Sequence, residues 1–222
     1  NQLNYIENND KKSYCSICKE QILEDKMDIA KMQFNDIYNK YVLREGAQKF
    51  LEYLKKTDFF EAPASAKFHS AYAGGLCAHS VNVYNRAVKA LTQEYGEDFQ
   101  GKFTMENIAV AALLHDVCKA DFYKEEIRNV KENGEWVPKK YYTVDDKLPY
   151  GHGEKSVYII SAFMKLTRNE AMAINWHMGG FDLRVKGGFF NLSDVFYEYP
   201  FALFIHLADI QATYLDEEEF VK

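Results

Sequence analysis

The sequence predicts an all-α protein, a helical bundle with one short β-hairpin inserted at about residues 126–144. Apolar residues recur at spacings of three and four along most of the chain, which indicates amphipathic helices. The exception is the segment around Asn133-Gly134, a strong hairpin-turn signal between residues that favour strands, among them Trp136, Val137 and Tyr141. Apolar residues make up 47% of the chain and aromatic residues 15%, which is ample material for a buried core.

The helical pattern is expected to begin at about Asn35. The preceding residues are polar and mixed in charge, so we expect an N-terminal extension over residues 1–35 and a main domain over residues 36–222. The main domain opens with a helix that ends at Pro63. Its apolar face is marked by Leu43, Ala47, Phe50, Leu51 and Leu54.

Five further helices are expected after Pro63. Residues 108–117 are apolar almost all round, so this helix is predicted to be central and buried. The last helix is expected over residues 193–215 with Ser193 as its N-cap, followed by a solvated acidic end over residues 216–219. The other three are expected around residues 81–91, 153–165 and 170–177, the last of them ended by a left-handed cap at Gly179-Gly180.

Charge and cysteine usage restrict the class of protein. The formal net charge of −6 argues against general binding of long nucleic acid, but bound cations would still allow a small phosphorylated substrate. No secretory signal or long apolar span is visible, so we expect a cytoplasmic protein with thiol cysteines and no membrane partner. The pair Cys15 and Cys18 forms half of a zinc knuckle without a second pair nearby, and a structural or incidental role is expected. The sequence begins with Asn, so we expect a few leading residues before it.

The most informative feature is an ordered set of metal-ligand residues. Imidazole nitrogens and carboxylate oxygens bind divalent metals of the first row. Six such residues exceed the needs of one ion, so we expect two ions, of Mn, Fe, Ni, Co, Zn or Mg, with a shared carboxylate. Charged groups at the end of an apolar run are costly to bury without a partner, and a metal is the natural one. The predicted ligands are His79, His115, Asp116, His152, His177 and Asp209.

Other residues are candidates for supporting the metal or binding the substrate. His206 and Asp209 are three apart on one helical face, so one is expected to ligate and the other to hold a ligand in place. His69 is a second candidate for such a role, although a histidine on an apolar face is more often a core residue. Arg184 and Lys186 would add positive charge at the leaving group, or would lie in a solvated loop. Aromatic residues that would stack on a base, or would pack in the core, are Tyr72, Trp176 and Phe181.

Several segments together resemble the histidine–aspartate (HD) metal-dependent phosphohydrolase superfamily over about residues 40–215. Within the superfamily they are most similar to the HD domain of bacterial 3′→5′ exoribonucleases, whose OB-fold has no counterpart in this sequence. The resemblance implies an all-α HD-domain bundle with the active site at its centre. The segments that carry it are FHSAYAGGL leading to His79-Ser80, LLHDVCK at residues 113–119, GHGEKS at residues 151–156, Trp176-His177, and HLAD at residues 206–209.

The same resemblance implies a role for each matching residue. One ion would be bound by His79, His115, Asp116 and Asp209. Asp116 would also bridge to a second ion held by His152 and His177. Lys119 matches a lysine that faces the substrate phosphate in many members, so Asp116 and Lys119 are the predicted catalytic residues.

The function that this predicts is cleavage of a phosphate ester of a nucleotide or short oligonucleotide by a metal-activated water. The enzyme would be a phosphomonoesterase or a phosphodiesterase. One alternative is a di-iron oxygenase, because the ligand order also resembles that of HD oxygenases related to myo-inositol oxygenase. The other is a regulator that binds a nucleotide without turnover. The sequence leaves open the oligomeric state, and whether the hairpin is a lid or a dimer contact.

Overall fold

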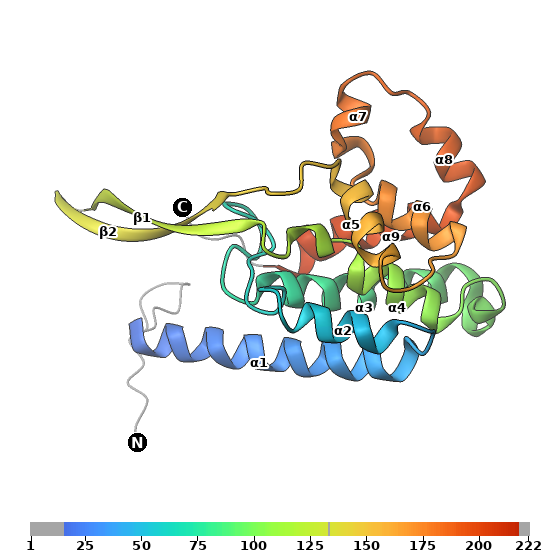
Figure 1. The fold of residues 1–222 in the computed structure, drawn as a ribbon, viewed down its shortest axis with the longest axis horizontal. Helices are drawn as coiled ribbons and strands as arrows, with labels where there is room; N and C mark the ends of the chain where they lie inside the picture. Colours follow the sequence, from blue (N-terminus) through green and yellow to red (C-terminus); the bar gives the residue numbers. More distant parts are fainter. Residues whose placement is uncertain (1–15, 133, 218–222) are drawn as a thin grey trace.

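The computed structural model describes residues 16–132 and 134–217, with the side chains of residues 16–20 and 132 left aside. Helices form the body of the molecule, and one antiparallel hairpin projects from it (Figure 1). The predicted all-α fold with a β-hairpin is therefore confirmed. Cys15 and the side chain of Cys18 lie outside the described residues, so the proposed role of this pair stays a prediction. Within the described ranges, no helix is long and apolar enough to cross a membrane.

The first helix begins earlier than the sequence indicated. α1 spans Ser16–Tyr41, whereas the helical pattern was expected to begin at about Asn35. Only a narrow stripe of its residues is buried, with Ala30, Phe34 and Tyr38 at spacings of four. Because most other positions are polar and solvent-facing, the apolar periodicity before residue 35 is weak. The helix runs across residue 35, and residues on both sides of that position pack in one core.

The helix predicted from residue 35 onward is in fact divided. After α1 the chain turns through Gly46, whose φ is 88°, and then forms α2, Ala47–Leu54. Leu43, predicted on the apolar face, lies in this turn and is 75% exposed. A Cβ at position 46 would lie 1.9 Å from the carbonyl oxygen of Phe163, so a side chain is excluded there for steric reasons as well.

The centre of the bundle is formed by α3, Gly75–Tyr95, which packs against α1, α4 and α9. α4 spans Met105–Leu114, and its residues 108–114 are buried as predicted. Its N-terminus is closed by a capping box between Thr104 and Asn107. Short 3₁₀ turns follow both helices, at Gly96–Gly101 after α3 and at Val117–Lys119 after α4.

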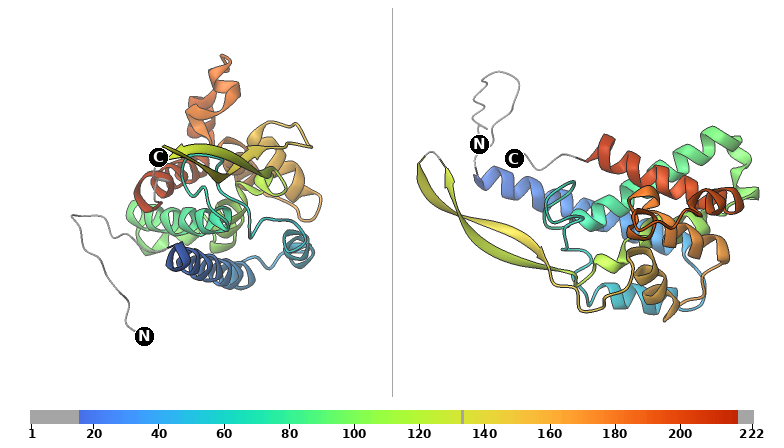
Figure 2. Two further views of the ribbon diagram at one scale, coloured as in Figure 1. Left: turned by 90° about the vertical axis from the view of Figure 1, so that its left-hand side faces the viewer. Right: turned by 90° about the horizontal axis from the view of Figure 1, so that it is seen from above.

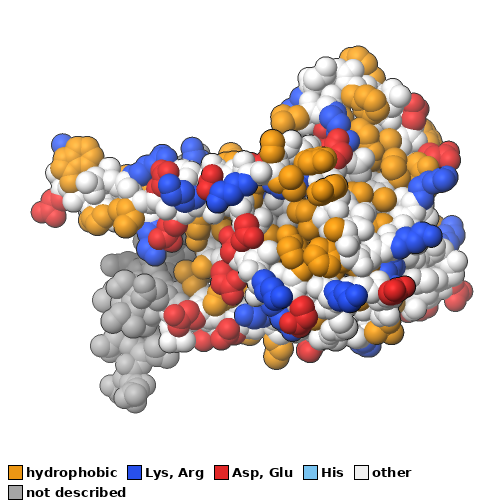
Figure 3. Space-filling model, viewed as in Figure 1, with side chains coloured by type: hydrophobic (Ala, Val, Ile, Leu, Met, Phe, Trp, Pro, Cys, Tyr) orange, Lys and Arg blue, Asp and Glu red, His pale blue; other side chains and the backbone are white. Residues whose placement is uncertain are grey.

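The hairpin consists of β1, Tyr123–Glu132, and β2, Glu135–Val144, paired without interruption from Tyr123↔Val144 to Glu132↔Glu135. It begins three residues before the predicted start. Gly134 in the predicted turn has a φ of 93°, a positive value of the kind that tight hairpin turns favour. The hairpin and the N-terminal half of α1 extend from the same side of the body (Figures 1 and 2). Several of its apolar residues are solvent-exposed, among them Ile127 and Trp136, the latter at 70%, and charged side chains lie along its length (Figure 3).

The C-terminal half forms a layer of shorter helices. α5, His152–Ser161, packs closely on α6, Arg168–Trp176, because Gly153 has no Cβ: one would lie 2.2 Å from the carbonyl oxygen of Asn175. A 3₁₀ turn at Gly179–Phe181 and the short α7, Leu183–Lys186, follow. The positive φ of Gly179, 51°, agrees with the predicted left-handed end of α6.

The single last helix predicted over residues 193–215 is wrong. Two helices occupy this segment, α8 at Leu192–Glu198 and α9 at Pro200–Gln211. Pro200 explains the division, since proline has no N–H to donate within a helix and is tolerated in its first turn. Asn191, and not Ser193, precedes the first turn of α8. α9 then continues as one π-helical turn, Ala212–Asp216.

Candidate metal centre

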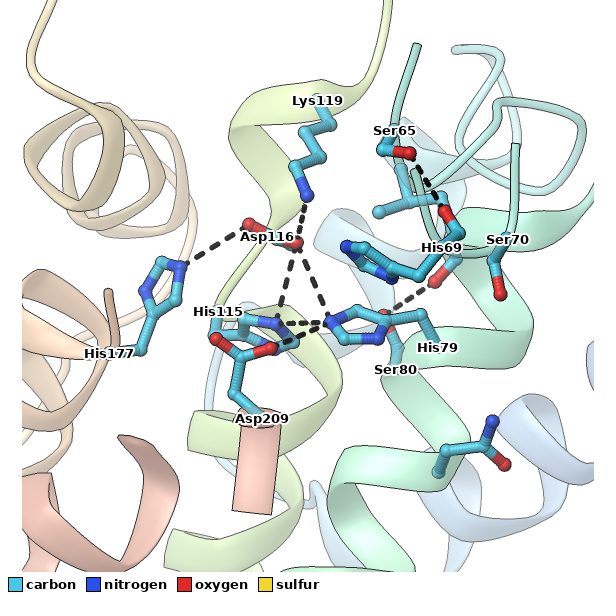
Figure 4. A network of polar contacts seen from close by, with 12 residues as sticks. Ser65, His69, Ser70, His79, Ser80, His115, Asp116, Lys119, His177 and Asp209 are labelled. Carbon is cyan, nitrogen blue, oxygen red and sulfur yellow. Dashed lines mark hydrogen bonds and ion pairs between the residues drawn. The ribbon is translucent and has the colours of Figure 1, made fainter. Parts of the chain in front are cut away.

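All six histidines of the sequence gather in one region of the bundle, although they lie on different elements. Figure 4 shows His69, His79, His115 and His177 together with Asp116 and Asp209. α3 carries His79, while His115 and Asp116 follow the last turn of the buried α4. His152 opens α5 and His177 follows the end of α6. Asp209 lies on α9, which packs against both α3 and α6. The fold therefore brings together the six ligands that the sequence predicted.

One part of the cluster is formed by His79, His115 and Asp209. The Nε2 atoms of His79 and His115 lie 3.2 Å apart, and His79 Nε2 lies 3.1 Å from Asp209 Oδ1. His115 Nδ1 donates to the carbonyl oxygen of Ala112 at 2.8 Å, and a carbonyl can only accept. The lone pair of His115 Nε2 therefore faces His79 Nε2. Two imidazole nitrogens with facing lone pairs repel each other at 3.2 Å, so a proton or a metal cation must lie between them.

Asp116 lies between this part of the cluster and the other two histidines. Its Oδ2 is 3.5 Å from His115 Nε2 and 3.8 Å from His79 Nε2. Its Oδ1 is 2.7 Å from His152 Nε2 and 3.4 Å from His177 Nε2. The two oxygens of one carboxylate therefore face two different pairs of imidazoles, which is the arrangement that a bridging carboxylate requires.

His177 provides the clearest sign that the site fits a cation. Its side chain is fully buried, and Nδ1 donates to the carbonyl oxygen of Ile174 at 2.7 Å. Among the described residues, Nε2 has no hydrogen-bond partner of acceptable geometry, although Asp116 Oδ1 lies 3.4 Å away. Burial lowers the pKa of His177, so its ring is neutral and carries a free lone pair on Nε2. A buried lone pair without a partner is costly, and a metal ion removes this cost.

The electrostatics of the cluster also favour a positive ion. Burial alone would lower the pKa of His79, but the carboxylates of Glu217 and Asp209 outweigh it and raise the pKa to about 10. Burial would raise the pKa of Asp116, yet the Lys119 ammonium and the neighbouring histidines hold it well below its usual range. The pKa of Asp209 is likewise lowered against burial, mainly by His79. Two buried, ionised carboxylates among imidazoles fit a divalent first-row cation.

Lys119 lies beside the cluster at the end of the short turn Val117–Lys119. Its Nζ is 2.6 Å from Asp116 Oδ2, and its side chain is 12% exposed. Burial disfavours its charged form, but the Asp116 carboxylate dominates and raises the pKa of Lys119, which therefore carries a positive charge. The structure thus places the two predicted catalytic residues in direct contact.

His206 holds the backbone of a predicted ligand, His177. Its Nδ1 donates to the backbone carbonyl of His177 at 2.6 Å. Its ring lies against Gly179, where a Cβ would come within 2.3 Å of the imidazole. His206 thus packs on the segment that carries His177, and it lies outside the cluster of Nε2 atoms.

Arg184 was considered for the leaving group or for a solvated loop, but the structure pairs its charge within the fold. The guanidinium donates to Asp182 Oδ2 at 2.7 Å, lies 2.6 Å from Glu154, and stacks 3.9 Å from the centre of the Trp176 ring. Trp176 is 5% exposed and also stacks on Phe189, so its faces are occupied within the fold. Phe181, in contrast, is 52% exposed.

Two residues at the site escaped the sequence analysis. Residues 216–219 were expected to be a solvated end. Of the two that the structure describes, Asp216 is exposed as expected, but the expectation is wrong for Glu217. The side chain of Glu217 is 2% exposed and its carboxylate lies 2.7 Å from both His69 and His79. The Cys118 thiol lies 3.5 Å from His152 Nδ1. No local pattern distinguishes a buried glutamate in an acidic run from its exposed neighbours, so only the fold reveals this contact.

Comparisons with known proteins agree with this geometry. The model of the HD domain matches residues 77–212, which include the six predicted ligands and Lys119. A search of curated proteins gave no significant match, and neither did a search of solved structures. The match covers more than half of the chain and coincides with the helices that carry the cluster. The protein therefore belongs to the HD domain family.

Proposed function

We propose that the protein is a metal-dependent phosphohydrolase that cleaves a phosphate ester of a nucleotide or short oligonucleotide. The observation that supports this most is the position of Asp116. One of its oxygens faces His79 and His115, the other faces His152 and His177, and Lys119 adds a fixed positive charge beside it. Such a site can bind cations at Asp116 and its imidazoles, and the Lys119 ammonium beside them attracts a phosphate.

The residues that would hold divalent ions are those whose lone pairs converge. One ion would be bound by His79, His115, Asp116 and Asp209, and a second by Asp116, His152 and His177. When bound, the ions supply a water of lowered pKa and neutralise charge on the phosphoryl group. Burial of His79, His115 and His177 excludes bulk water from their side of the site, which strengthens each charge interaction there.

Lys119 is the residue that we assign to the phosphate. Its ammonium is held by Asp116, so its position is fixed before a substrate arrives. A phosphate oxygen could take the remaining donor sites of Nζ, and no conformational change of the lysine would be needed. Asp116 thus has two roles in this proposal, as a shared ligand and as the group that orients Lys119.

Two features support a nucleotide or short oligonucleotide as the substrate. The segments around His79, His115-Asp116 and His152 resemble the HD domains of 3′→5′ exoribonucleases. The exposed ring of Phe181 lies four residues after His177 in sequence, and it offers a face for stacking on a base. We also propose a cytoplasmic location, since Cys77 and Cys118 are free thiols in the described part of the chain.

The test is hydrolysis in the presence of Mn²⁺, measured as release of inorganic phosphate from mononucleotides and as release of mononucleotides or shorter products from cyclic dinucleotides and short RNA and DNA oligomers. Asp116→Ala is the inactive control. Glu135→Gln, on the exposed hairpin, is the control for effects of substitution and purification that do not involve the site. Release that requires Asp116 supports the proposal and identifies the substrate class. Turnover that persists in Asp116→Ala contradicts it.

The same panel addresses the alternative functions. Oxygen consumption by an iron-loaded sample, with no phosphate release in Mn²⁺, would instead indicate an oxygenase at this ligand set. Tight nucleotide binding without either activity would indicate a regulator.

A further inference from the structure

Glu217 follows the π-helical turn Ala212–Asp216 at the end of α9. This turn packs against α3, the helix that carries His79. The preceding residue, Asp216, forms an ion pair with Arg86 on α3, in which Arg86 Nε donates to Asp216 Oδ2 at 2.7 Å. The chain therefore returns to α3 after α9 and is fixed there immediately before Glu217. π-turns of this kind occur frequently at functional sites.

The Glu217 carboxylate accepts hydrogen bonds on both oxygens. Oε1 lies 2.7 Å from His79 Nδ1, while Oε2 lies 2.7 Å from His69 Nδ1 and 2.8 Å from Ser70 Oγ. Ser70 has a φ of 45°, an uncommon conformation for a residue with a side chain. Asn82 Nδ2 is 3.5 Å from Oε1.

This contact determines how His79 faces the metal centre. A carboxylate oxygen beside Nδ1 accepts a hydrogen bond, so His79 keeps its proton on Nδ1, and Nε2 is the nitrogen that faces His115 and Asp209 and is left to bind an ion. His115 and His177 are held in the same way, but by neutral backbone carbonyls. His79 alone of these three rings is held by a charged group, which makes it the more basic ligand.

A third metal ion at this position fits less well. His69, His79 and Glu217 are close enough to be considered as ligands. However, both N···O distances of 2.7 Å are those of ordinary hydrogen bonds. His79 already directs Nε2 at the main cluster, so an ion on Nδ1 would require a ring without any proton. The geometry favours a hydrogen-bonded carboxylate over a ligand.

We infer that Glu217 is a positioning residue, which orients His79 for metal binding and joins the C-terminal turn to the metal centre through His69 and Ser70. The inference rests on the metal centre of the proposed function. Neither His69 nor Glu217 lies within residues 77–212, the part of the chain that matches the HD domain. This connection is therefore a feature that the family match does not include.

The experiment is calorimetric titration of the full chain with Co²⁺, together with the visible absorption spectrum of the bound ion. Glu217→Gln keeps the shape but loses the charge and one acceptor, and we expect it to weaken Co²⁺ binding about 10- to 100-fold and to change the spectrum. Asp216→Asn is the matched control, because it changes the adjacent carboxylate, which pairs with Arg86 and not with a histidine. Its Co²⁺ affinity should stay within about twofold of wild type, as expected of a group outside the metal centre's hydrogen bonds.

Equal Co²⁺ affinity and equal spectra for Glu217→Gln and wild type would overturn the inference. Failure of the wild-type protein to bind any divalent ion would instead overturn the proposed function. If Glu217→Gln does not fold, a measurement on the wild-type protein still tests the inference. In the zinc-loaded protein, the Nδ1 proton of His79 should give a downfield NMR resonance that is protected from exchange. A rapidly exchanging proton would contradict the contact with Glu217.

Discussion

Lys119 Nζ lies 2.6 Å from Asp116 Oδ2, although both side chains are nearly buried, at 12% and 3% exposure. Asp116 is also the residue that faces four imidazoles, those of His79, His115, His152 and His177. Figure 4 shows it between His177 and the pair His79 and His115. One carboxylate thus connects the candidate metal ligands to the candidate phosphate-binding residue. Substitutions separate these two roles, because loss of a ligand weakens metal binding, whereas loss of a substrate contact lowers turnover.

Lys119→Met should separate metal binding from turnover. The substitution removes a cation next to Asp116, so affinity for Mn²⁺ should be unchanged or higher. Loss of the phosphate contact should lower kcat/KM at least tenfold, since hydrogen bonds to charged groups contribute about 1.5–3 kcal/mol. Calorimetry and phosphate release check the two parts. Loss of Mn²⁺ binding in the folded variant would show that Lys119 maintains the site and does not serve the substrate.

Gly179→Ala should disturb the candidate metal centre indirectly, through His206 and the segment that carries His177. The backbone at Gly179 has a φ of 51°, and a Cβ would come within 2.3 Å of the His206 ring, which bonds to the carbonyl of His177. We expect a loss of stability of more than about 1 kcal/mol and weaker metal binding. Gly180→Ala is the matched control, since a Cβ there meets no described atom within 4 Å. Urea unfolding and metal titration measure both effects, and similar results for the two variants would refute the steric argument.

Glu170→Gln should destabilise the fold. Glu170 is fully buried at the start of α6 and binds the Arg44 guanidinium through both oxygens, at 2.6 and 2.7 Å. The substitution leaves Arg44 with only the more exposed Glu106 as a charge partner, and breaking a buried pair costs about 3 kcal/mol. Glu52→Gln removes an exposed partner of Lys55 and should leave stability unchanged. Urea unfolding of both variants is the measurement, and a comparable effect in each would contradict a special role for the buried pair.

Glu106 should contribute a pH-dependent part of the stability. Burial would raise its pKa, but Arg44 and the backbone N–H groups of Leu43 and Arg44 outweigh it, so the pKa of folded Glu106 is lowered. A lowered pKa means that the stabilisation is present above the unfolded value of about 4.3 and is lost as the pH falls through the folded pKa. The difference in unfolding free energy between wild type and Glu106→Gln should therefore shrink from pH 7 to pH 3. A constant difference would exclude this charge effect.

The sequence by itself determined the helical class, the hairpin turn and the buried nature of α4. These depend on patterns within a few residues, namely the period of apolar positions, Asn133-Gly134, and the continuous apolar run before His115. It also indicated the six predicted ligands, because histidine and aspartate residues in this order are typical of a metal site. The start of α1 escaped this reasoning, since only one narrow stripe of that helix is buried.

Only the tertiary structure decided which groups meet. Glu217 lies among acidic residues, and nothing local distinguishes it until α9 returns the chain to α3 and buries it against His79. Arg184 reads as a free cation in sequence, yet the fold pairs it with Asp182 and Glu154. Hydrogen bonds and ion pairs between distant segments depend on where whole helices pack. Sequence periodicity specifies which face of a helix is buried, but the packing of the complete core determines what that face contacts.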